Sequence, residues 1–510
     1  MPQCQITNEP KRIACGAPDI VLLNKENSPV AYIETKDIGD PDLHGVKQNK
    51  EQFDRYRQGL DLVVFTDFLR FLLYQAGECV LEVQVAKQDG DHLSLLSDAE
   101  VRFDELVAHL RDAQPVPLTS PKRLALLMAG KAQLLARAIH TVLSDAKSDA
   151  GKDLHLQLER MKRVLMSEVS PAEFADWYAQ TLVYGLFAAR YHDEHLDTFS
   201  REEAAKLIPQ STPFLRKLFQ QIGVYDLDER IAWIIDDLVT VFGATDVRSL
   251  LDSNRDVRDP VMLFYEDFLT AYNPERRKAR GVYYTPAPVV SFIVRAVDDL
   301  LQKTFGVKDG LADDSLTLDG QHRLQILDPA TGTGTFLVEV VRTIYSKFAG
   351  QTGVWNNYVR EHLLPRLHGY ELLMAPYAMA HLNLEHVFYQ TGATDLGDAR
   401  YGIYLTNTLE AQHPYTDALQ GLFPIDKEAE AANALKRDMR VMVMLGNPPY
   451  SRGSKNKSEW IEGLMQSYKT DLNEQNIQPL SDDYIKFIRY AQWQIERTGE
   501  GVVAFITNNS

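Results

Sequence analysis

A glycine-bearing turn between a strand and a helix constrains the fold of this chain most. The apolar run Leu324–Leu327 has the length of a strand and leads into the turn Asp328–Phe336, which reads DPATGTGTF. The stretch that follows, Leu337–Tyr345, has a helical pattern. Gly332 and Gly334 let the backbone turn sharply and approach a ligand closely, as strand-to-helix turns that hold nucleotides require. We therefore expect a sheet covered by helices, with a ligand at the ends of its strands.

Further strand-like runs extend this pattern. His368–Glu371 and Val441–Leu445 are each followed by a turn that contains glycine or proline, or by a helical stretch. Such alternation is typical of a doubly wound, Rossmann-like sheet. The second of these runs leads into Gly446–Tyr450, which reads GNPPY. Because neither a strand nor a helix continues through Pro448 and Pro449, the sequence predicts a rigid loop there.

The length of the chain and its changes of pattern predict several domains. A chain of 510 residues is too long for one ordinary domain and suggests about three. Residues 1–115 predict a small α/β domain, because they contain strand-length apolar runs rich in β-branched residues at Ile20–Leu23, Val30–Ile33 and Leu62–Phe65. A polar stretch that favours a helix, Val46–Leu60, lies between the second and third runs. Residues 116–258 show helical periodicity and predict an α-helical connector. Residues 259–510 alternate strands and helices again, so we expect a multi-domain α/β protein whose last domain holds the glycine turn.

Composition and charge exclude several classes of protein. Hydrophobic residues make up 45% and charged residues 25% of the chain, which excludes disordered and fibrous proteins. The three cysteines (Cys4, Cys15 and Cys79) lack CxxC spacing, which argues against a disulfide scaffold and a zinc cluster. The net charge of −17 confines any surface for nucleic acid to a local basic groove. With no signal-peptide pattern and no membrane-spanning run, we expect a cytoplasmic protein without a membrane partner.

The glycine turn and the GNPPY loop together resemble motifs I and IV of the S-adenosylmethionine-dependent N6-adenine DNA methyltransferases. Upstream, Gly281–Pro286 reads GVYYTP and resembles motif X, and Glu371 matches the acid of motif II. The order of motif X, motif I and the NPPY loop is that of the γ group. Further along the chain, Phe487 lies where the wall formed by motif V is expected, and the strand Val502–Thr507 resembles motif VI.

The resemblance implies a site for two ligands. Asn447 and Pro448 would accept hydrogen bonds from the exocyclic amine of adenine, and Tyr450 would stack on a base extruded from double-stranded DNA. Motifs X, I and II would bind S-adenosylmethionine, with Glu371 on its ribose hydroxyls. The residues carried over as catalytic are Asn447, Pro448, Pro449 and Tyr450. The residues carried over as cofactor-binding are Tyr284, Thr285, Asp328, Ala330, Gly332, Gly334, Phe336 and Glu371.

A second group of chemistry-bearing residues lies near the amino terminus. The dipeptide PD ends at Asp19, where a predicted strand begins, and the next strand closes with ETK, from Glu34 to Lys36. In adjacent strands these side chains would meet at one edge, where the two acids could hold Mg²⁺ and the lysine could orient or activate the attacking water. Gln52 and Tyr56 follow on a predicted helix, one turn apart and on the same face.

This second group resembles the PD-(D/E)xK nucleases and their QxxxY element. The resemblance implies that Asp19, Glu34, Lys36 and Gln52 are catalytic and that Asp19 and Glu34 bind the metal. Only eighteen residues precede Asp19, so we expect the helix that normally begins the nuclease core to be short or absent. A solvated strand end with an ordinary salt bridge remains an alternative.

The combination of domains resembles single-chain restriction-modification enzymes of the type IIG, IIL and ISP classes. Residues Asp259–Pro286 look most like the type ISP enzymes. No GxxxxGK[ST] loop for ATP-driven translocation is present, so the organisation follows types IIG and IIL. The resemblance implies methylation of double-stranded DNA at adenine N6, Mg²⁺-dependent cleavage of unmodified DNA, and phage defence.

Target recognition and three alternatives stay open. The sequence stops at Ser510, soon after motif VI, so we expect a partner or a further segment to supply target recognition. The first alternative is a phage-defence adenine methyltransferase whose nuclease-like domain is inert and serves interaction. The second is a methyltransferase that acts on glutamine side chains of proteins, and the third is a remnant that binds DNA or the cofactor without catalysis.

Overall fold

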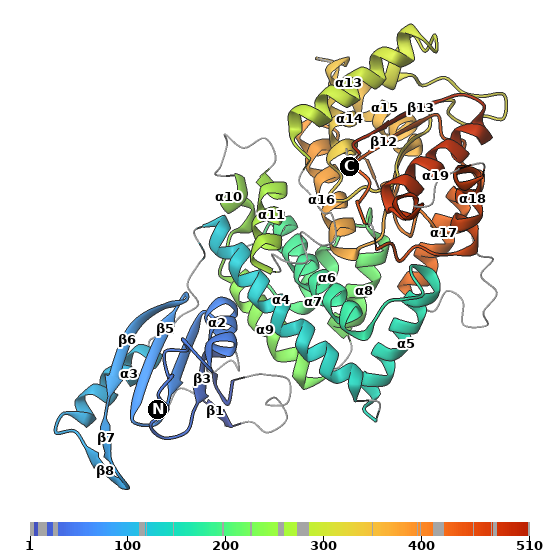
Figure 1. Ribbon diagram of the computed structural model, residues 1–510. Helices are drawn as coiled ribbons and strands as arrows, with labels where there is room; N and C mark the ends of the chain where they lie inside the picture. The colour runs from blue at the N-terminus through green and yellow to red at the C-terminus, as the bar shows by residue number, and fades with distance from the viewer. Residues whose placement is uncertain are drawn as a thin grey trace. The chain divides into compact units, whose positions relative to one another are not determined.

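The computed structural model contains two compact units, which are described separately (Figure 1). The amino-terminal unit comprises Met1–His155, Pro171–Leu207 and Phe219–Asn273, and the carboxyl-terminal unit comprises Leu156–Ser170, Ile208–Leu218 and Pro274–Ser510. The residues that the structure describes are 5–8, 18–23, 29–111, 118, 120–145, 147–195, 198–224, 227–252, 260–272, 285–348, 350–394, 396–397, 399–411, 423–451, 453–470, 472 and 477–507. Within these ranges, no helix is long and apolar enough to cross a membrane.

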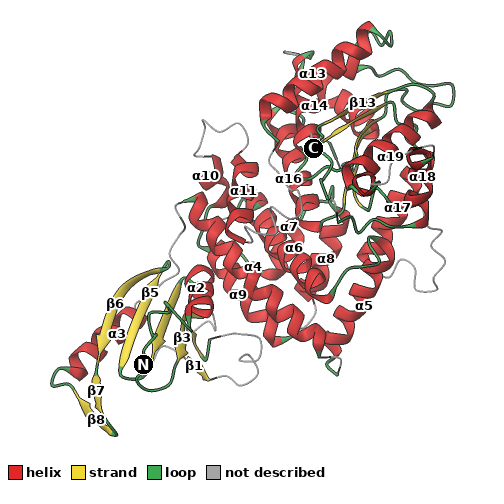
Figure 2. Cartoon of the chain, viewed as in Figure 1, coloured by secondary structure: helices red, strands yellow, loops and turns green. Residues whose placement is uncertain are grey.

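A six-stranded sheet forms the first part of the amino-terminal unit (Figure 2). Its strands run in chain order across the sheet: β1 (Gln5–Asn8), β2 (Ile20–Leu23), β3 (Pro29–Thr35), β4 (Leu62–Thr66), β5 (Arg70–Gln75) and β6 (Glu78–Gln84). Only β3 and β4 are parallel neighbours, and parallel strands need a crossover connection. Helix α2 (Lys50–Gly59) is that crossover, with Phe53 and Tyr56 fully buried. The three strands and the helix that the sequence predicts here are confirmed.

Two smaller elements complete the sheet region. A hairpin of β7 (Ala86–Asp89) and β8 (His92–Leu95) follows β6, and helix α3 (Ala99–Arg111) comes next. Leu106 and Leu110 of α3 join the core formed by the apolar side chains of the sheet.

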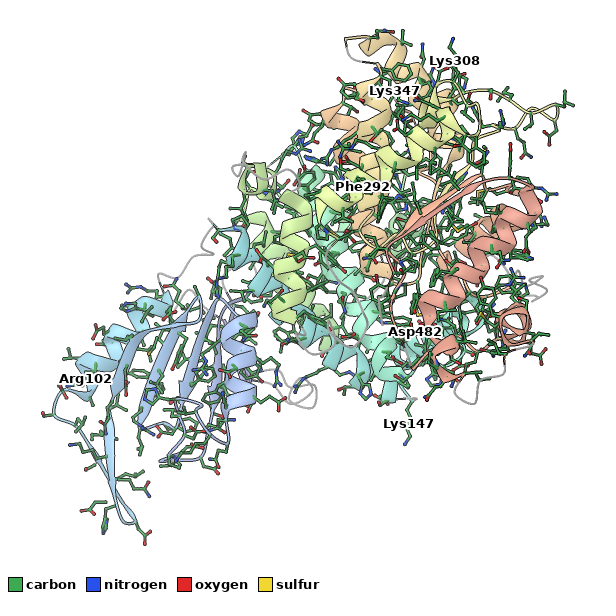
Figure 3. All side chains as sticks on the ribbon, turned by 45° about the horizontal axis from the view of Figure 1, so that its top comes forward. Arg102, Lys147, Phe292, Lys308, Lys347 and Asp482 are labelled. Carbon is green, nitrogen blue, oxygen red and sulfur yellow. The ribbon has the colours of Figure 1, made fainter. Side chains whose placement is uncertain are left out.

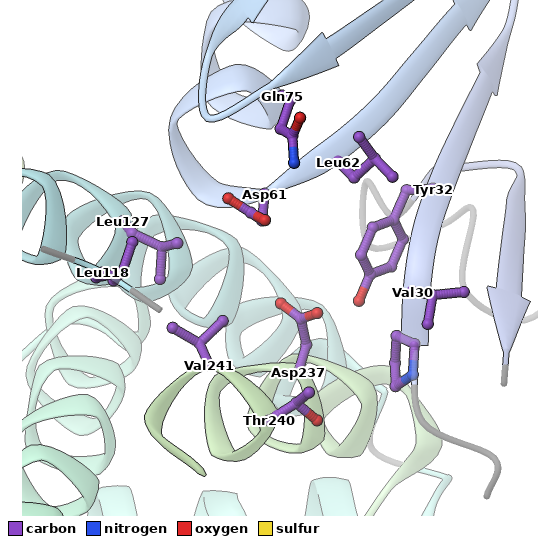
Figure 4. A pocket seen from close by; sticks show the side chains of 11 residues that line it. Val30, Tyr32, Asp61, Leu62, Gln75, Leu118, Leu127, Asp237, Thr240 and Val241 are labelled. Carbon is purple, nitrogen blue, oxygen red and sulfur yellow. The ribbon is translucent and has the colours of Figure 1, made fainter. Parts of the chain in front are cut away.

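Helices make up the rest of the amino-terminal unit. They are α4 (Pro121–Ser144), α6 (Pro171–His192), α7 (Arg201–Leu207), α9 (Glu229–Gly243), α10 (Val247–Asp252) and α11 (Pro260–Tyr272), while α5 (Asp149–Val164) and α8 (Pro213–Val224) have residues in both units. Ser120 caps α4 by accepting the Arg123 N–H, with Pro121 at the first helical position. A pocket beside β3 is lined by Tyr32 and by Asp237 of α9 (Figure 4). The fully buried Lys131 of α4 forms an ion pair with Asp237.

Helices α2 and α4 touch through two glycines. A Cβ added at Gly130 would lie 2.5 Å from the Cα and N of Gly59, which are backbone atoms that cannot turn aside. We expect Gly130→Ala to destabilise the protein by about 1–3 kcal/mol, because overpacking outweighs the better helix propensity of alanine. Gly463→Ala is the matched control, since Gly463 lies in a helix with nothing within 4 Å of its added Cβ. Thermal unfolding should lower the melting temperature of the first variant and not of the second.

The carboxyl-terminal unit is built on a five-stranded sheet in which all neighbouring strands are parallel. The strands are β9 (Ile326–Asp328), β10 (Leu367–Glu371), β11 (Ile403–Leu405), β12 (Val443–Gly446) and β13 (Val502–Phe505), and their order is β11-β10-β9-β12-β13. The chain therefore runs outward from β9 on one side and returns to build the other side. This reversal places a topological switch point between β9 and β12, where open α/β sheets bind ligands at the carboxyl ends of their strands.

Helices accompany the strands of this second sheet (Figure 1). They are α13 (Ala287–Lys303), α14 (Thr335–Ser346), α15 (Thr352–Tyr358), α16 (Met374–Gln390), α17 (Pro424–Asp438), α18 (Glu459–Lys469) and α19 (Asp483–Thr498). One core cluster joins side chains of the central strands, such as Leu327 and Met444, to Tyr490 of α19. The α/β alternation predicted for this part of the chain is confirmed.

Candidate functional site

The glycine turn and the proline-rich loop meet at the switch point of the second sheet. Strands β9 and β12 are neighbours, with Val443 opposite Ile326, and each leads directly into its loop. A Cβ added at Gly446 would lie 2.6 Å from Oδ1 of Asp328. Only glycine at position 446 lets this carboxylate lie against the neighbouring backbone, so the first residues of the two loops are in contact.

The glycine turn adopts the conformation that its sequence predicts. Gly332 and Gly334 have positive φ angles of 56° and 85°, which favour glycine, and α14 begins directly after the turn. The Gly332 N–H donates to Oε2 of Glu371 at 2.8 Å, and the Leu373 N–H donates to Oε1 of the same carboxylate at 2.8 Å. Among the residues that the structure describes, no atom lies within 4 Å of a Cβ added at Gly332, so the turn has open space beside it there. Phe336, at the start of α14, is buried.

Two buried acids lie at the bottom of this turn. Asp328 is 1% exposed, its Oδ1 accepts the Ala330 N–H at 3.1 Å, and its Oδ2 has no hydrogen-bond partner in the described part of the chain. Burial raises the pKa of Asp328 to about 8 and the pKa of Glu371 to about 7. A buried oxygen without a partner among the described residues, in a turn with open space beside Gly332, fits a ligand that donates N–H or O–H groups. S-adenosylmethionine, a nucleoside that carries an amino acid on its sulfur, offers such groups.

These raised pKa values predict how stability depends on pH. The ordinary pKa is 3.8 for Asp328 and 4.5 for Glu371, so both carboxyls bind protons more tightly in the folded chain than in the unfolded one. Their contribution to stability is therefore complete below about pH 4 and is lost as the pH rises through about 7 to 8. We expect the free energy of unfolding of the ligand-free chain to fall between about pH 5 and pH 8, and to fall less in Glu371→Gln. Urea unfolding at successive pH values measures this, and parallel curves for the two proteins would contradict it.

The NPPY loop carries its polar groups inward and is held at both ends. The Asn447 amide donates from Nδ2 to Oγ1 of Thr285 at 3.0 Å and accepts at Oδ1 from the Tyr450 hydroxyl at 2.8 Å. Pro448 is buried, while Asn447, Pro449 and Tyr450 are half-buried. The Tyr450 ring meets the ring of Tyr484 edge to face, with centroids 5.9 Å apart. The polar side chain of Asn447 is thereby fixed in a rigid loop whose aromatic residue lies beside it.

The far end of the loop is tied to the start of α19. The Ser451 N–H donates to Oδ1 of Asp482 at 2.7 Å, and the Asp483 N–H donates back to the Ser451 carbonyl at 3.3 Å. Asp482, labelled in Figure 3, also caps α19 by accepting the Tyr484 N–H. An acid directly before a helix is a capping signal in sequence, and it could have pointed to this anchor, which the motifs did not.

The second group of predicted residues is also brought together. Asp19 and Glu34 lie at the ends of neighbouring strands, and Oδ2 of Asp19 accepts from the Thr35 N–H at 2.7 Å and from its hydroxyl at 2.6 Å. Oε1 of Glu34 accepts from Lys36 Nζ at 2.8 Å and from Gln52 Nε2 at 2.7 Å. Lys36 Nζ also donates to Oε1 of Gln52 at 3.0 Å.

One oxygen of this cluster is left for a ligand. Oε2 of Glu34 is buried and has no hydrogen-bond partner among the described residues. Burial, followed by the nearby Asp19 carboxylate, raises the pKa of Glu34, while Lys36 and Gln52 lower it. A cation would relieve both causes of the rise, so the pair of acids fits Mg²⁺ in chemistry. In the described part of the chain, no group of three or more acidic, histidine or cysteine side chains is placed to hold a metal.

The remaining predicted residues lie as follows. Thr285 is buried just before α13, and Ala330 is half-buried against the core. Tyr284, like the rest of Gly281–Tyr284, lies outside the described residues. Phe487 is buried in the core cluster of the sheet. Sequence reasoning missed Thr35, which holds Asp19, although it lies inside the ETK triplet.

The fold and the position of the loops define a class of protein. A doubly wound parallel sheet with a glycine turn and a rigid loop at its switch point is the architecture of nucleotide-binding α/β domains. Residues 256–509 match the model of the N-6 DNA Methylase family.

Solved structures share the fold of the chain. A complex of DrdV with DNA is 24% identical with a TM-score of 0.54, and the match covers 99% of this chain and 46% of that one. The ATP-dependent type ISP restriction-modification enzyme LlaBIII bound to DNA is 22% identical with a TM-score of 0.57, covering 82% and 27%. A nuclease-deletion mutant of the type ISP enzyme LlaGI with a DNA substrate mimic is 20% identical with a TM-score of 0.55, covering 81% and 31%.

The chain spans less than half the length of each of these three proteins, and at such identities the likeness concerns the fold alone. No curated protein matches the chain in sequence.

Proposed function

We propose that the carboxyl-terminal unit transfers a methyl group from S-adenosylmethionine to N6 of adenine in double-stranded DNA. The single observation that carries this proposal is the contact between the two loops at the switch point, where Asp328 lies against Gly446. This contact gives the glycine turn and the NPPY loop a common edge of the sheet, as a reaction between a bound donor and a bound base requires. The match of residues 256–509 to the N-6 DNA Methylase family supports the choice of reaction.

The chemistry follows from the groups on the NPPY loop. The exocyclic amine of adenine is a poor nucleophile, because its lone pair is delocalised into the ring. The Asn447 side-chain carbonyl and the Pro448 backbone carbonyl would accept its two hydrogens and favour a tetrahedral nitrogen with its lone pair freed. Pro449 keeps the loop rigid, and Tyr450 would stack on the extruded base.

The glycine turn and its neighbours would hold the methyl donor. When bound, S-adenosylmethionine supplies an electrophilic methyl group on a sulfonium. Glu371 would accept from the ribose hydroxyls, while Gly332 and Gly334 leave room for the donor beside the backbone. The remaining cofactor-binding residues that we propose are Tyr284, Thr285, Asp328, Ala330 and Phe336.

We further propose that the amino-terminal cluster cleaves DNA. Asp19 and Glu34 would bind Mg²⁺, Lys36 would orient or activate the attacking water, and Gln52 would hold Glu34 and Lys36 in place. Mg²⁺ supplies Lewis-acid assistance to phosphodiester hydrolysis when it is bound. The buried Oε2 of Glu34, which has no hydrogen-bond partner in the described part of the chain, supports this assignment.

Together these activities describe a restriction-modification enzyme, in which methylation protects host DNA and cleavage attacks unmodified phage DNA. The three structural relatives named above were all solved with DNA or a DNA mimic, and two are described as restriction-modification enzymes. Such an enzyme would work in the cytoplasm, with double-stranded DNA as its partner and with target recognition supplied by a further segment or a second protein.

An inert nuclease-like domain is the second candidate for the amino-terminal cluster. The observation that favours it is that two acids, not three, meet among the described residues. In that case the protein is a phage-defence adenine methyltransferase whose amino-terminal domain serves interaction.

One incubation tests both activities. The full chain, S-adenosylmethionine carrying a labelled methyl group and unmethylated phage DNA are mixed with and without Mg²⁺. We expect N6-methyladenine in the nucleosides by mass spectrometry, and strand breaks only with Mg²⁺. Label in protein glutamine, with none in DNA, would overturn the first proposal. Methylation without breaks would leave the inert-domain candidate.

A further inference from the structure

A hydrogen bond joins motif X to the NPPY loop across a long stretch of chain. Oγ1 of Thr285, just before α13, accepts from Nδ2 of Asn447 at 3.0 Å, although the two residues are 162 positions apart. Thr285 is 8% exposed. The bond is partly buried in the carboxyl-terminal unit and reaches the side chain to which the proposed reaction assigns the target amine.

The two ends of the Asn447 amide have opposite chemistry. The carbonyl end accepts hydrogen bonds, and the NH₂ end only donates. The amine of adenine offers its two hydrogens to the site, so only the carbonyl end can receive them. If the Asn447 amide rotated by 180°, its NH₂ group would face the amine of adenine, and both groups would be hydrogen-bond donors. The terminal torsion of asparagine is broad and roughly two-fold, so its partners decide which end points where.

The partners of the Asn447 amide are the hydroxyl groups of Thr285 and Tyr450. Binding of the target base would affect these two hydrogen bonds differently. The Tyr450 hydroxyl donates to Oδ1 of Asn447, which is the acceptor that the target amine needs. Because a carbonyl oxygen has two lone pairs, Oδ1 would accept the target amine beside the Tyr450 hydroxyl or in place of it. The bond to Thr285 is on the other end of the amide and survives base entry.

We propose that Thr285 is a positioning residue, whose hydroxyl oxygen holds the Asn447 amide with its carbonyl directed to the target amine. This inference rests on the proposed methyl transfer and goes beyond a role of Thr285 in binding the cofactor. A hydroxyl can accept and donate at once. In a cofactor-binding role, the Thr285 hydroxyl would donate its hydrogen to the carboxylate of S-adenosylmethionine. The hydroxyl oxygen could then only accept a hydrogen bond, so the Asn447 amide would have one stable orientation.

Steady-state methylation of unmethylated phage DNA by the full chain, at saturating S-adenosylmethionine, tests this inference. Thr285→Val keeps the shape and removes the hydroxyl, and we expect its kcat to fall about tenfold or more. Thr285→Ser restores the oxygen and should recover most of the rate. Thr391→Val is the matched control, because Thr391 is also buried in this unit and also accepts a side-chain N–H, from Trp355 at 3.1 Å, outside the proposed site.

Several outcomes would overturn the inference. One is a wild-type kcat in Thr285→Val. A higher KM for S-adenosylmethionine with full turnover at saturation would do the same, since it confines Thr285 to cofactor binding. A serine variant as slow as the valine variant would show that the hydroxyl is not responsible.

A second readout does not depend on turnover. In protein labelled with ¹⁵N-asparagine and bound to S-adenosylhomocysteine, the side-chain amide signal of Asn447 is the one missing from Asn447→Ala. We expect a hydrogen-bonded, slowly exchanging proton in the wild type and in Thr285→Ser, and its loss in Thr285→Val. An unchanged signal in Thr285→Val would overturn the inference. A wild type that shows the protected proton but never methylates DNA would overturn the proposed function instead.

Discussion

Asn447→Ala is expected to lower the kcat of adenine methylation by about 10³-fold while leaving the donor bound. The side-chain carbonyl accepts an amine hydrogen most strongly when the nitrogen becomes tetrahedral, which is a feature of the transition state and not of the free base. Interactions that strengthen only in the transition state act on kcat. Calorimetric titration with S-adenosylmethionine should therefore show an affinity within about threefold of the wild type, and single-turnover methylation should show the loss.

The matched control is Asn357→Ala. Asn357 is exposed on α15, and its Oδ1 accepts from Arg360 at 3.0 Å on the surface. This variant should methylate DNA at the wild-type rate. Equal losses in both variants would indicate a general effect on folding, and full activity of Asn447→Ala would remove the NPPY loop from the reaction.

Glu34→Ala is expected to abolish Mg²⁺-dependent cleavage, by about 10³-fold or more, and to leave methylation unchanged. Glu34 accepts from both Lys36 and Gln52, so its removal takes away a metal ligand and also releases the lysine. The two proposed sites lie in different compact units, with Glu34 in the amino-terminal unit and Asn447 in the carboxyl-terminal one. The measurement is agarose-gel analysis of phage DNA alongside mass spectrometry of its nucleosides.

Glu82→Ala provides the control for this second experiment, because Glu82 is an exposed glutamate on β6 of the same sheet. It should cleave as the wild type does. Cleavage that persists in Glu34→Ala would place hydrolysis elsewhere in the protein. A wild type that never cleaves would favour the inert interaction domain.

Several of the strands that the sequence predicted have a strong apolar pattern. Strands β4 and β12 are buried throughout, so their apolar runs are continuous and easily read. Strand β8 has four residues, all exposed, and β11 has three residues, so neither run is long enough to distinguish a strand pattern from chance. Sequence reasoning could not find such strands, because their pairing partners and not their own side chains define them.

A boundary also shifted for a local physical reason. The sequence predicted helix from Val46 onward, whereas α2 begins at Lys50. The carboxylate of Asp42 accepts the backbone N–H groups of Val46, Lys47 and Asn49, and so holds the preceding residues in a loop. Side chains that bond to the backbone in this way compete with helix formation.

In the candidate sites, too, some contacts could be predicted from the sequence and others could not. The motifs predicted which residue types gather, and Glu34, Lys36 and Gln52 are indeed hydrogen-bonded to one another. The bond between Thr285 and Asn447 could not be predicted, because it depends on how the segment before α13 lies in three dimensions.

The missing side chain at Gly446 has a consequence for engineering the protein. Asp328 fills the space that a Cβ at position 446 would need. The side chain of Asp328 and the backbone at the start of the NPPY loop are therefore in van der Waals contact. Neither loop can be moved outward alone without opening a void, and neither can be moved inward without a collision. Variants selected to accept bulkier alkyl donors should therefore keep glycine at this position and enlarge the site at its rim.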